Sequence, residues 1–423
     1  MTLSLKPGTS WDEVYARARS AAPEAFDADR ILNLAGGEWQ RIGTPGQHVT
    51  PVDGQLVPGP PRIEHDDAVT AVKQAAAEHR RWSTVDLDER KVKAAAAVAA
   101  MRRHRDTLAL LLVWEIGKPW RLACADVDRA LSGVDWYLGE IERQLVARTA
   151  LPGPVSNIAS WNYPMSVQVH SELVQLLAGN AVVAKTPSQG GFHTLTLAHA
   201  LMRREGLPVS LLSGVGSKLG DALISAPEIG ALAFVGGRTN GRKAATTLAD
   251  TGKRHMLEQE GLNAWGVWDF SQWDLLAGHL KKGFEYAKQR CTAYPRYVVQ
   301  RELFPEFLQA YLPVVDALRW ATRWRSRHRM KTCPSSTSAR SSTPPRPPSC
   351  ASAMPRPSPA GASRCATGPC PTARSWTGRT PARTSRRPAS WSRRRRGPCG
   401  TPSRSGRSTP SCWWTPRPSC WRR

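Results

Sequence analysis

The spacing of apolar residues first indicates a helical N-terminal part. Residues 1–60 are mixed and rich in glycine and proline, and some edge structure is expected within Ile31–Val57. Further along, apolar residues recur at intervals of three and four, which is the period of a helix with one buried face. Gly117 and Pro119 are typical helix-stop signals. The amphipathic or helical segments expected here are Trp11–Ala21, Asp66–Trp82, Leu87–Gly117 and Leu122–Leu145.

From Pro154 onward, short apolar runs alternate with helical segments. This alternation implies a parallel sheet covered by helices, so we predict an α/β fold. The expected strands are Val155–Ala159, Ala181–Ala184, Ser210–Ser213, Leu232–Val235 and Ala264–Trp268. The expected helices are one after Pro164, then Thr194–Arg204, Arg242–Asp250 and Asp274–Arg290, the last ending just before Cys291.

The composition changes abruptly after Trp320. Residues 321–423 contain 22 arginines and one lysine, no acidic residue, and no Leu, Ile, Val, Phe or Tyr. Such a segment has almost no apolar surface to bury against the entropy cost of ordering. We therefore predict a disordered Arg/Pro/Ser-rich tail over residues 320–423.

This tail also explains the charge of the protein. The whole chain carries a formal net charge of +25, which alone would suggest a nucleic-acid or membrane-surface partner. The first 320 residues hold 36 basic and 34 acidic residues, a net charge of only +2. The body is therefore expected to be near-neutral and to bind neither membranes nor nucleic acid.

Two origins of the tail are open. One is a genuine basic extension that binds nucleic acid. The other, which we favour, is a reading-frame slip in a GC-rich gene. When plausible GC-rich codons are read from the third base of each, the segment Trp320–Arg346 translates to a sequence that contains DFGPVI. In the same way, Pro402–Trp421 translates to one that contains EPFGPV. Both texts lie in the same frame and have normal globular composition.

The cysteines and the N-terminus indicate the compartment. Seven of the nine cysteines follow position 320, which leaves only Cys124 and Cys291 in the body. This count argues against a disulfide framework and fits a reducing cytosol. The first twenty residues have no apolar run behind a basic start, and no stretch approaches the roughly 20 apolar residues that span a bilayer. A cytoplasmic location is expected.

Six motifs occur in one order. They are EIGKP at Glu115–Pro119, SWNYP around Asn162, AVVAK ending at Lys185, FVGGRTNG at Phe234–Gly241, MLEQEGLNA around Glu258 and GFEYAKQRC ending at Cys291. In this order they resemble the aldehyde dehydrogenase superfamily, and the resemblance covers about residues 30–319. DFGPVI and EPFGPV in the alternative frame resemble family motifs downstream of the nucleophile.

The resemblance implies NAD(P)-dependent oxidation of an aldehyde to a carboxylate. Cys291 would attack the carbonyl to form a thiohemiacetal, because a thiolate is strongly nucleophilic near neutral pH. The Asn162 amide and the backbone N–H of Cys291 would stabilise the oxyanion. Glu258 would activate the water that cleaves the resulting thioester. Taken singly, these residues have simpler readings as a structural cysteine, a turn asparagine and a solvated acid, and Glu260 competes with Glu258 for the last role.

The resemblance also implies a nucleotide site. Lys185 corresponds to the family lysine that hydrogen-bonds the adenosine ribose, although a strand-end surface lysine is the simpler reading. Glycines at the start of a helical segment let backbone N–H groups approach a pyrophosphate, or merely form a turn. The residues assigned to NAD or NADP are Trp161, Lys185, Ser188, Gly236, Gly237 and Gly241, and no metal ligands are predicted.

The chain departs from the family pattern at several of these positions. Ser188 stands where NAD-preferring members often carry an acid that binds the ribose diol, and its absence leaves room for the 2′-phosphate of NADP. Gly237 stands where a serine is common, which removes a side-chain contact to phosphate. Lys288 stands where the family generally has glycine, close to the nucleophile.

By this resemblance the chain should divide into three parts. Residues 1–259 would hold the N-terminal helices and a Rossmann-like NAD(P)-binding domain, residues 260–319 a truncated catalytic domain, and residues 320–423 the tail. Family members are homo-oligomers, but the strand that completes the oligomerisation arm would be missing here. The aldehyde remains unidentified, because its pocket needs residues from the missing region.

Two other functions remain open. A nucleic-acid-binding protein that has co-opted a dehydrogenase-like domain would show salt-dependent binding that deletion of residues 321–423 abolishes. A CoA-acylating aldehyde dehydrogenase would pass the thioester to CoA. Glu258 argues against the second alternative, because a hydrolytic base serves no purpose there.

The chain as written is expected to oxidise aldehydes poorly or not at all, because about half of the catalytic domain would be missing. An assay of the purified chain for aldehyde-dependent NAD(P)H formation checks this expectation, and robust turnover would contradict it. The nucleotide sequence around codons 316–322 would separately test the frame slip.

Overall fold

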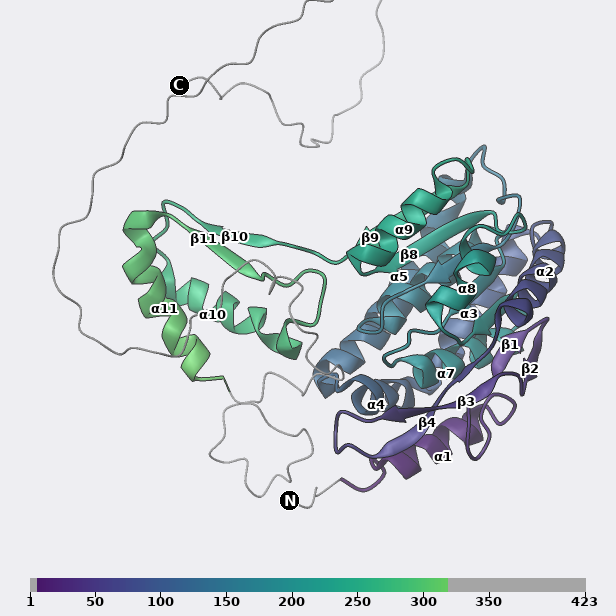
Figure 1. Cartoon of the computed structure of the whole chain (residues 1–423), viewed down its shortest axis with the longest axis horizontal. Helices are drawn as coiled ribbons and strands as arrows, with labels where there is room; N and C mark the ends of the chain where they lie inside the picture. The colour runs from purple at the N-terminus through teal and green to yellow at the C-terminus, as the bar shows by residue number, and fades with distance from the viewer. Residues whose placement is uncertain (1–5, 319–423) are drawn as a thin grey trace, which may run out of the picture. The chain divides into compact units, whose positions relative to one another are not determined.

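A computed structural model of the chain describes residues 6–318 (Figure 1). The predicted tail of residues 320–423 lies outside the described residues. The helices of the N-terminal part are α1 (Trp11–Ala21), α2 (His65–Trp82), α3 (Leu87–Arg103), α4 (Arg105–Ile116) and α5 (Trp120–Leu145). A π-helical turn (Pro164–Val169), α6 (His170–Leu177), α7 (Phe192–Arg204), α8 (Gly216–Ile224) and α9 (Arg238–Leu248) follow. The last described helices are α10 (Trp273–Gly283), a short 3-10 turn (Arg301–Leu303) and α11 (Phe304–Asp316).

The predicted parallel sheet is present and has seven strands in the order β2-β1-β7-β6-β5-β8-β9. Its five parallel strands are β5 (Val155–Ile158), β6 (Val182–Lys185), β7 (Val209–Leu212), β8 (Ala231–Gly236) and β9 (Arg254–Gln259). The antiparallel strands β1 (Asn33–Ala35) and β2 (Glu38–Gln40) extend one edge. The expected edge structure also includes the hairpin of β3 (Thr44–Val49) and β4 (Leu56–Arg62). The α/β expectation is therefore confirmed.

The single helix predicted over Leu87–Gly117 is wrong. The structure ends α3 at Arg103 and starts α4 at Arg105, because His104 leaves the helical conformation with φ −103° and ψ 14°. The two halves bury different surfaces: α3 buries one alanine-rich side, whereas every residue of α4 from Thr107 to Ile116 is buried. Because the two halves bury different surfaces, they form two separate helices. The stop signal was correct, since Gly117 ends α4 in the left-handed conformation that favours glycine.

The helix predicted over Asp274–Arg290 is also wrong beyond its first three turns. α10 ends at Gly283, and a 3-10 turn follows over Glu285–Lys288. Three consecutive residues in this turn have positive φ, namely Tyr286 (57°), Ala287 (50°) and Lys288 (59°). The Tyr286 side chain is fully buried in the main hydrophobic core. Tertiary burial therefore overrides the local helical pattern.

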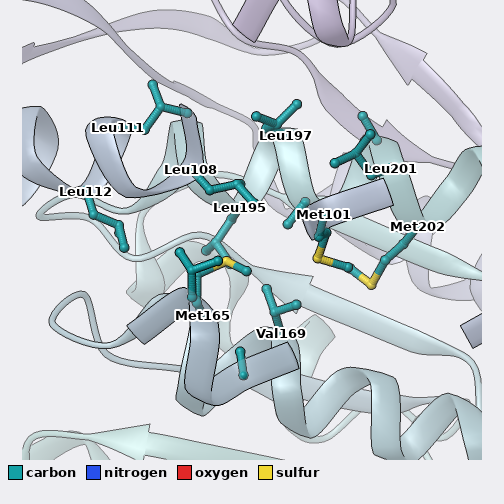
Figure 2. Packing of buried hydrophobic residues seen from close by; sticks show 14 of the residues in the cluster. Met101, Leu108, Leu111, Leu112, Met165, Val169, Leu195, Leu197, Leu201 and Met202 are labelled. Carbon is teal, nitrogen blue, oxygen red and sulfur yellow. The ribbon is translucent and has the colours of Figure 1, made fainter. Parts of the chain in front are cut away.

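The main core is built from the N-terminal helices and one face of the sheet. α3 and α4 contribute Met101, Leu108 and Leu111, which pack with Leu195 and Met202 of α7 (Figure 2). The Met165 and Val169 side chains of the π-helical turn enter the same cluster. The segment that carries Asn162 is thus fixed to the core directly after that residue.

A second, small cluster lies around β10 (Ala264–Val267) and β11 (Arg296–Val299). These strands pair in parallel and, among residues 6–318, neither has a second neighbour. α10 and α11 supply its buried residues Leu276, Leu280 and Phe307. On the sheet, Val298 is 57 % exposed, and Trp268, just after β10, is 73 % exposed. This unit therefore leaves apolar sheet surface uncovered within the described residues.

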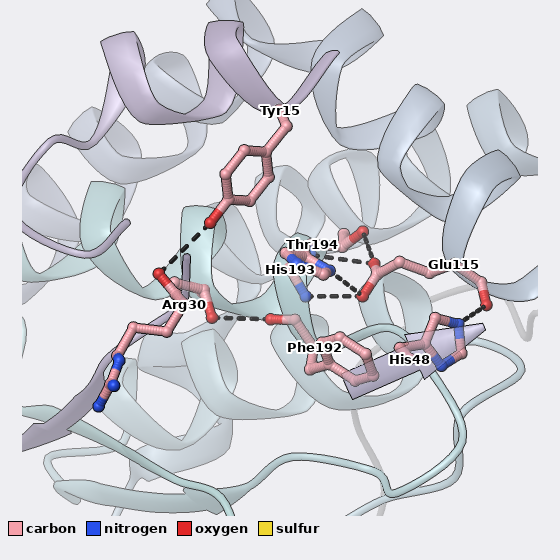
Figure 3. A network of polar contacts seen from close by, with 8 residues as sticks. Tyr15, Arg30, His48, Glu115, Phe192, His193 and Thr194 are labelled. Carbon is pink, nitrogen blue, oxygen red and sulfur yellow. Dashed lines mark hydrogen bonds and ion pairs between the residues drawn. The ribbon is translucent and has the colours of Figure 1, made fainter. Parts of the chain in front are cut away.

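The start of α7 is held by a buried carboxylate rather than by a cap of its own. Glu115, at the end of α4, accepts hydrogen bonds from the backbone N–H of His193 at 2.7 Å and of Thr194 at 3.2 Å. It also accepts from the Thr194 hydroxyl and contacts His193 Nδ1 at 2.9 Å, while its backbone carbonyl contacts His48 Nε2 (Figure 3). Burial raises the pKa of the Glu115 carboxyl, but the pairing with His193 and these hydrogen bonds outweigh burial and hold the pKa below its usual range.

In the described part of the chain, no helix is long and apolar enough to cross a membrane. No group of three or more His, Cys, Asp or Glu residues there is arranged to hold a metal ion.

We expect Glu115→Ala to lower the free energy of unfolding by about 3 kcal/mol, because it leaves two buried amides of α7 without an acceptor. Urea denaturation measures the change. The contribution should be full above the pKa of an unfolded glutamate and fade as the pH falls through the lowered folded-state pKa.

Glu38→Ala is the matched control, since Glu38 is exposed on the edge strand β2 and should change stability by no more than about 0.5 kcal/mol. Equal effects of the two substitutions would contradict the capping role of Glu115.

Candidate active site

Cys291 lies in the loop that follows the strained turn at Tyr286–Lys288, and its side chain is exposed. The Asn263 side chain donates from Nδ2 to the Cys291 carbonyl at 2.6 Å and to the Ala293 carbonyl at 3.0 Å. Gly261 packs so tightly against this loop that an added Cβ would meet the Cys291 carbonyl at 2.0 Å. The chain just after β9 therefore contacts the backbone carbonyl of the candidate nucleophile at both Gly261 and Asn263.

Asn162 lies in the turn between β5 and the π-helical turn. Its Nδ2 donates to the backbone carbonyl of Gln289 at 2.9 Å, and its Oδ1 accepts from the Ser160 hydroxyl at 2.7 Å. Gln289 precedes Cys291 by two residues. The structure thus brings the predicted oxyanion donor and the predicted nucleophile loop together across 127 positions of sequence.

Glu258 is not brought into contact with either of them. It is exposed near the end of β9, where it pairs with Val235 of β8. Among the described residues, no hydrogen bond or ion pair joins it to Cys291 or Asn162. Glu260 has a different environment, because its Oε1 accepts from the backbone N–H of Arg238 at 3.4 Å, at the start of α9. The two candidate carboxylates are therefore distinguished by their neighbours.

Lys185 ends β6 with its side chain buried. Its Nζ donates to the Thr186 carbonyl at 2.8 Å, and no other acceptor for it occurs in the described part of the chain. Burial lowers the pKa of Lys185 to about 8. Ser188 lies three residues further along and is exposed. A buried ammonium with unused donors fits a polar ligand better than it fits a purely structural position.

The other residues assigned to the nucleotide have mixed environments. Gly237 is the residue before α9 and makes no side-chain cap, and an added Cβ would lie 4.0 Å from Glu260 Oε2. Gly236 and Gly241 have packing reasons to be glycine, because an added Cβ would come within 2.7 Å of Phe234 and 2.8 Å of Gln259, respectively. Trp161 is half-buried, with its ring centroid 6.3 Å from that of Tyr286. The binding roles of these residues stay predictions.

Two site-proximal residues received no role from the sequence. Lys118, in the EIGKP motif, is fully buried and contacts Asp126 of α5 at 2.9 Å. Its Nζ also donates to the backbone carbonyl of Asn162 at 2.6 Å. A signal was available, because Asp126 stands on the apolar face of α5, between Ala123 and Ala130. An acid at such a position implies a buried partner.

Residues 40–340 match the sequence profile of the aldehyde dehydrogenase family, and the chain belongs to this family. It is 28 % identical over 307 residues to NADP-dependent glyceraldehyde-3-phosphate dehydrogenase of Pisum sativum, covering 65 % of this chain and 60 % of that protein. The chain spans about three fifths of the length of the curated relatives it matches.

Solved structures share the fold. The betaine aldehyde dehydrogenase of Staphylococcus aureus, in complex with NAD+, superimposes with a TM-score of 0.67 at 21 % identity, over 77 % of this chain and 66 % of that one. The NADP-dependent glyceraldehyde-3-phosphate dehydrogenase of Bacillus halodurans, complexed with NADP, gives a TM-score of 0.62 at 24 % identity, over 69 % of this chain and 65 % of that one.

The buried Lys185 ammonium should destabilise the ligand-free protein. Its folded-state pKa of about 8 lies below the 10.5 of an ordinary lysine, so the unfolded chain binds more protons between these pH values and stability rises with pH there. We expect Lys185→Met to be more stable than the parent at pH 7 by about 3 kcal/mol. The difference should shrink from pH 8 upward and nearly vanish above pH 10.5.

Urea denaturation of both proteins across this pH range measures the effect. The control is Lys73→Met, because Lys73 is exposed on α2. A Lys185→Met variant that is less stable than the parent at pH 7 would show that the ammonium is satisfied in the ligand-free protein.

Proposed function

We propose that the described residues form the nucleophile, oxyanion and nucleotide parts of an NAD(P)-dependent aldehyde dehydrogenase, which oxidises an aldehyde to a carboxylate. The observation that carries the proposal is the hydrogen bond from Asn162 Nδ2 to the carbonyl of Gln289, two residues before Cys291. Family membership supports the same reaction.

The residues have separable roles in this proposal. The Cys291 thiolate attacks the aldehyde carbon, and the carbonyl oxygen becomes an oxyanion that the Asn162 amide and the Cys291 backbone N–H stabilise. Cys291 suits this step because its side chain is exposed, and Asn162 suits it because hydrogen bonds hold its side chain in place. Glu258 is proposed as the base for acyl-cysteine hydrolysis, since it has no competing partner among the described residues, whereas Glu260 accepts from the start of α9.

NAD or NADP fits the residues assigned to it. Lys185 is buried with unused donors that could bond to ribose hydroxyls. A pyrophosphate at the start of α9 would replace the Glu260 carboxylate, which accepts from the Arg238 N–H there. When bound, the nicotinamide accepts the hydride that leaves the substrate carbon. The exposed Ser188 brings no negative charge toward the ribose, which favours room for the 2′-phosphate of NADP.

We further propose the division into residues 1–259 for nucleotide binding and 260–319 for a partial catalytic domain. It is supported by the separate hydrophobic cluster around β10 and β11. A cytoplasmic location is proposed from the two free cysteines in the described part. Homo-oligomer formation is proposed from the family alone, and no residue of this chain is assigned to it.

Two reactions of the Cys291 thiol distinguish an effect on oxyanion stabilisation from an effect on the accessibility of the thiol. Acylation by p-nitrophenyl acetate passes through a tetrahedral oxyanion as the thiolate displaces p-nitrophenolate, whereas alkylation by iodoacetamide displaces iodide without one. In the full chain, Asn162→Ala should lower the ratio of acylation to alkylation rate by at least about tenfold. Mass spectrometry of the Cys291 peptide measures both rates without interference from the other cysteines.

Asn180→Ala is the matched control, because the Asn180 side chain bonds instead to Leu151 and to backbone carbonyls of the same turn. An unchanged ratio in Asn162→Ala would refute the oxyanion role and, with it, the proposed function.

A further inference from the structure

Lys118 and Asp126 form a buried ion pair that the proposed mechanism does not use. Lys118 and Asp126 are both 0 % exposed and lie 2.9 Å apart. Burial lowers the pKa of Lys118, and the Asp126 carboxylate opposes that change. A buried ion pair stabilises a protein no better than a well-packed apolar pair does, so stability alone does not explain this one. The contacts of the pair therefore indicate its role.

Those contacts bracket the segment that carries Asn162. Lys118 Nζ donates to the Asn162 carbonyl at 2.6 Å. Asp126 Oδ1 accepts from the backbone N–H of Ser166 at 2.9 Å, inside the π-helical turn. The two members of the pair thus fix the backbone on both sides of the Tyr163–Met165 stretch, and Asn162 has its backbone fixed at its own carbonyl.

The same ammonium reaches the nucleophile side. It lies 3.5 Å from the centroid of the Tyr163 ring and 5.5 Å from that of Tyr286, within the range of cation–π attraction. Tyr286 belongs to the left-handed turn that leads to Cys291. One charge therefore contacts both chain segments that the hydrogen bond from Asn162 to Gln289 joins.

From these contacts we infer that Lys118, held by Asp126, is a positioning residue that aligns the Asn162 amide with the Cys291 loop. The inference rests on the proposed function of that amide. It predicts that loss of the pair harms reactions through an oxyanion and spares reactions that form none.

The test uses the full chain and the ratio of acylation to alkylation at Cys291. Lys118→Met/Asp126→Asn removes both charges, keeps the side-chain volumes similar and retains an acceptor for the Ser166 amide. This variant should lower the ratio by at least about tenfold, as expected when an oxyanion donor is misplaced. Adding Asn162→Ala to it should lower the ratio little further, because both changes remove the same contribution.

Glu172→Gln is the control, since Glu172 forms another fully buried pair, with His199 at 3.2 Å, and it should leave the ratio within about twofold of the parent. Thermal unfolding identifies variants that are folded. Should the double variant not fold, Asp126→Asn alone takes its place, and its ratio should fall at least about threefold.

The outcomes distinguish the two proposals. If Asn162→Ala lowers the ratio but the folded Lys118 and Asp126 variants match the parent, the positioning role is overturned and the proposed function stands. If Asn162→Ala has no effect, the proposed function fails and the positioning role fails with it.

Discussion

The buried carboxylate of Glu115 is the contact on which the N-terminal body depends. It closes the end of α4 against the start of α7 and supplies acceptors that α7 itself lacks, since the residue before that helix is Gly191. Through His193 it reaches the aromatic cluster of α1, where the Trp11 and His193 ring centroids lie 5.0 Å apart. Helices α4 and α7, the N-terminal helix and a contact from the β3–β4 hairpin thus meet at one residue, the hairpin through the Glu115 backbone carbonyl.

Glu115 and Lys118 belong to one short motif but have different uses. The acid organises the core behind the sheet, and the lysine three residues later faces the turn that carries Asn162. Gly117 lies between them in the left-handed conformation and redirects the chain. A segment of four residues thereby links the stability of the body to the alignment of the candidate site.

The local pattern of apolar residues predicts much of the fold because most elements bury one regular face. α2 and α5 carry apolar residues at helical spacing, and their observed bounds differ from the predicted ones by no more than two residues. No glycine or proline marks the break at His104, so the local sequence does not indicate it. The turn at Tyr286 follows from burial of that side chain in the main core, which is built mostly from residues far away in the sequence. The order of motifs predicts roles for Asn162 and Cys291, but the link from Lys118 to Asn162 spans 44 positions and follows only from the three-dimensional fold.

The isolated pair of β10 and β11 has a consequence for the behaviour of the protein in solution. Each strand offers an outer row of backbone hydrogen-bonding groups without a partner among residues 6–318, beside the exposed side chains of Val298 and Trp268. Such open edges are templates for strand addition by another polypeptide. Self-association through this unit would depend on protein concentration, and chaperones that recognise extended apolar segments would compete with it.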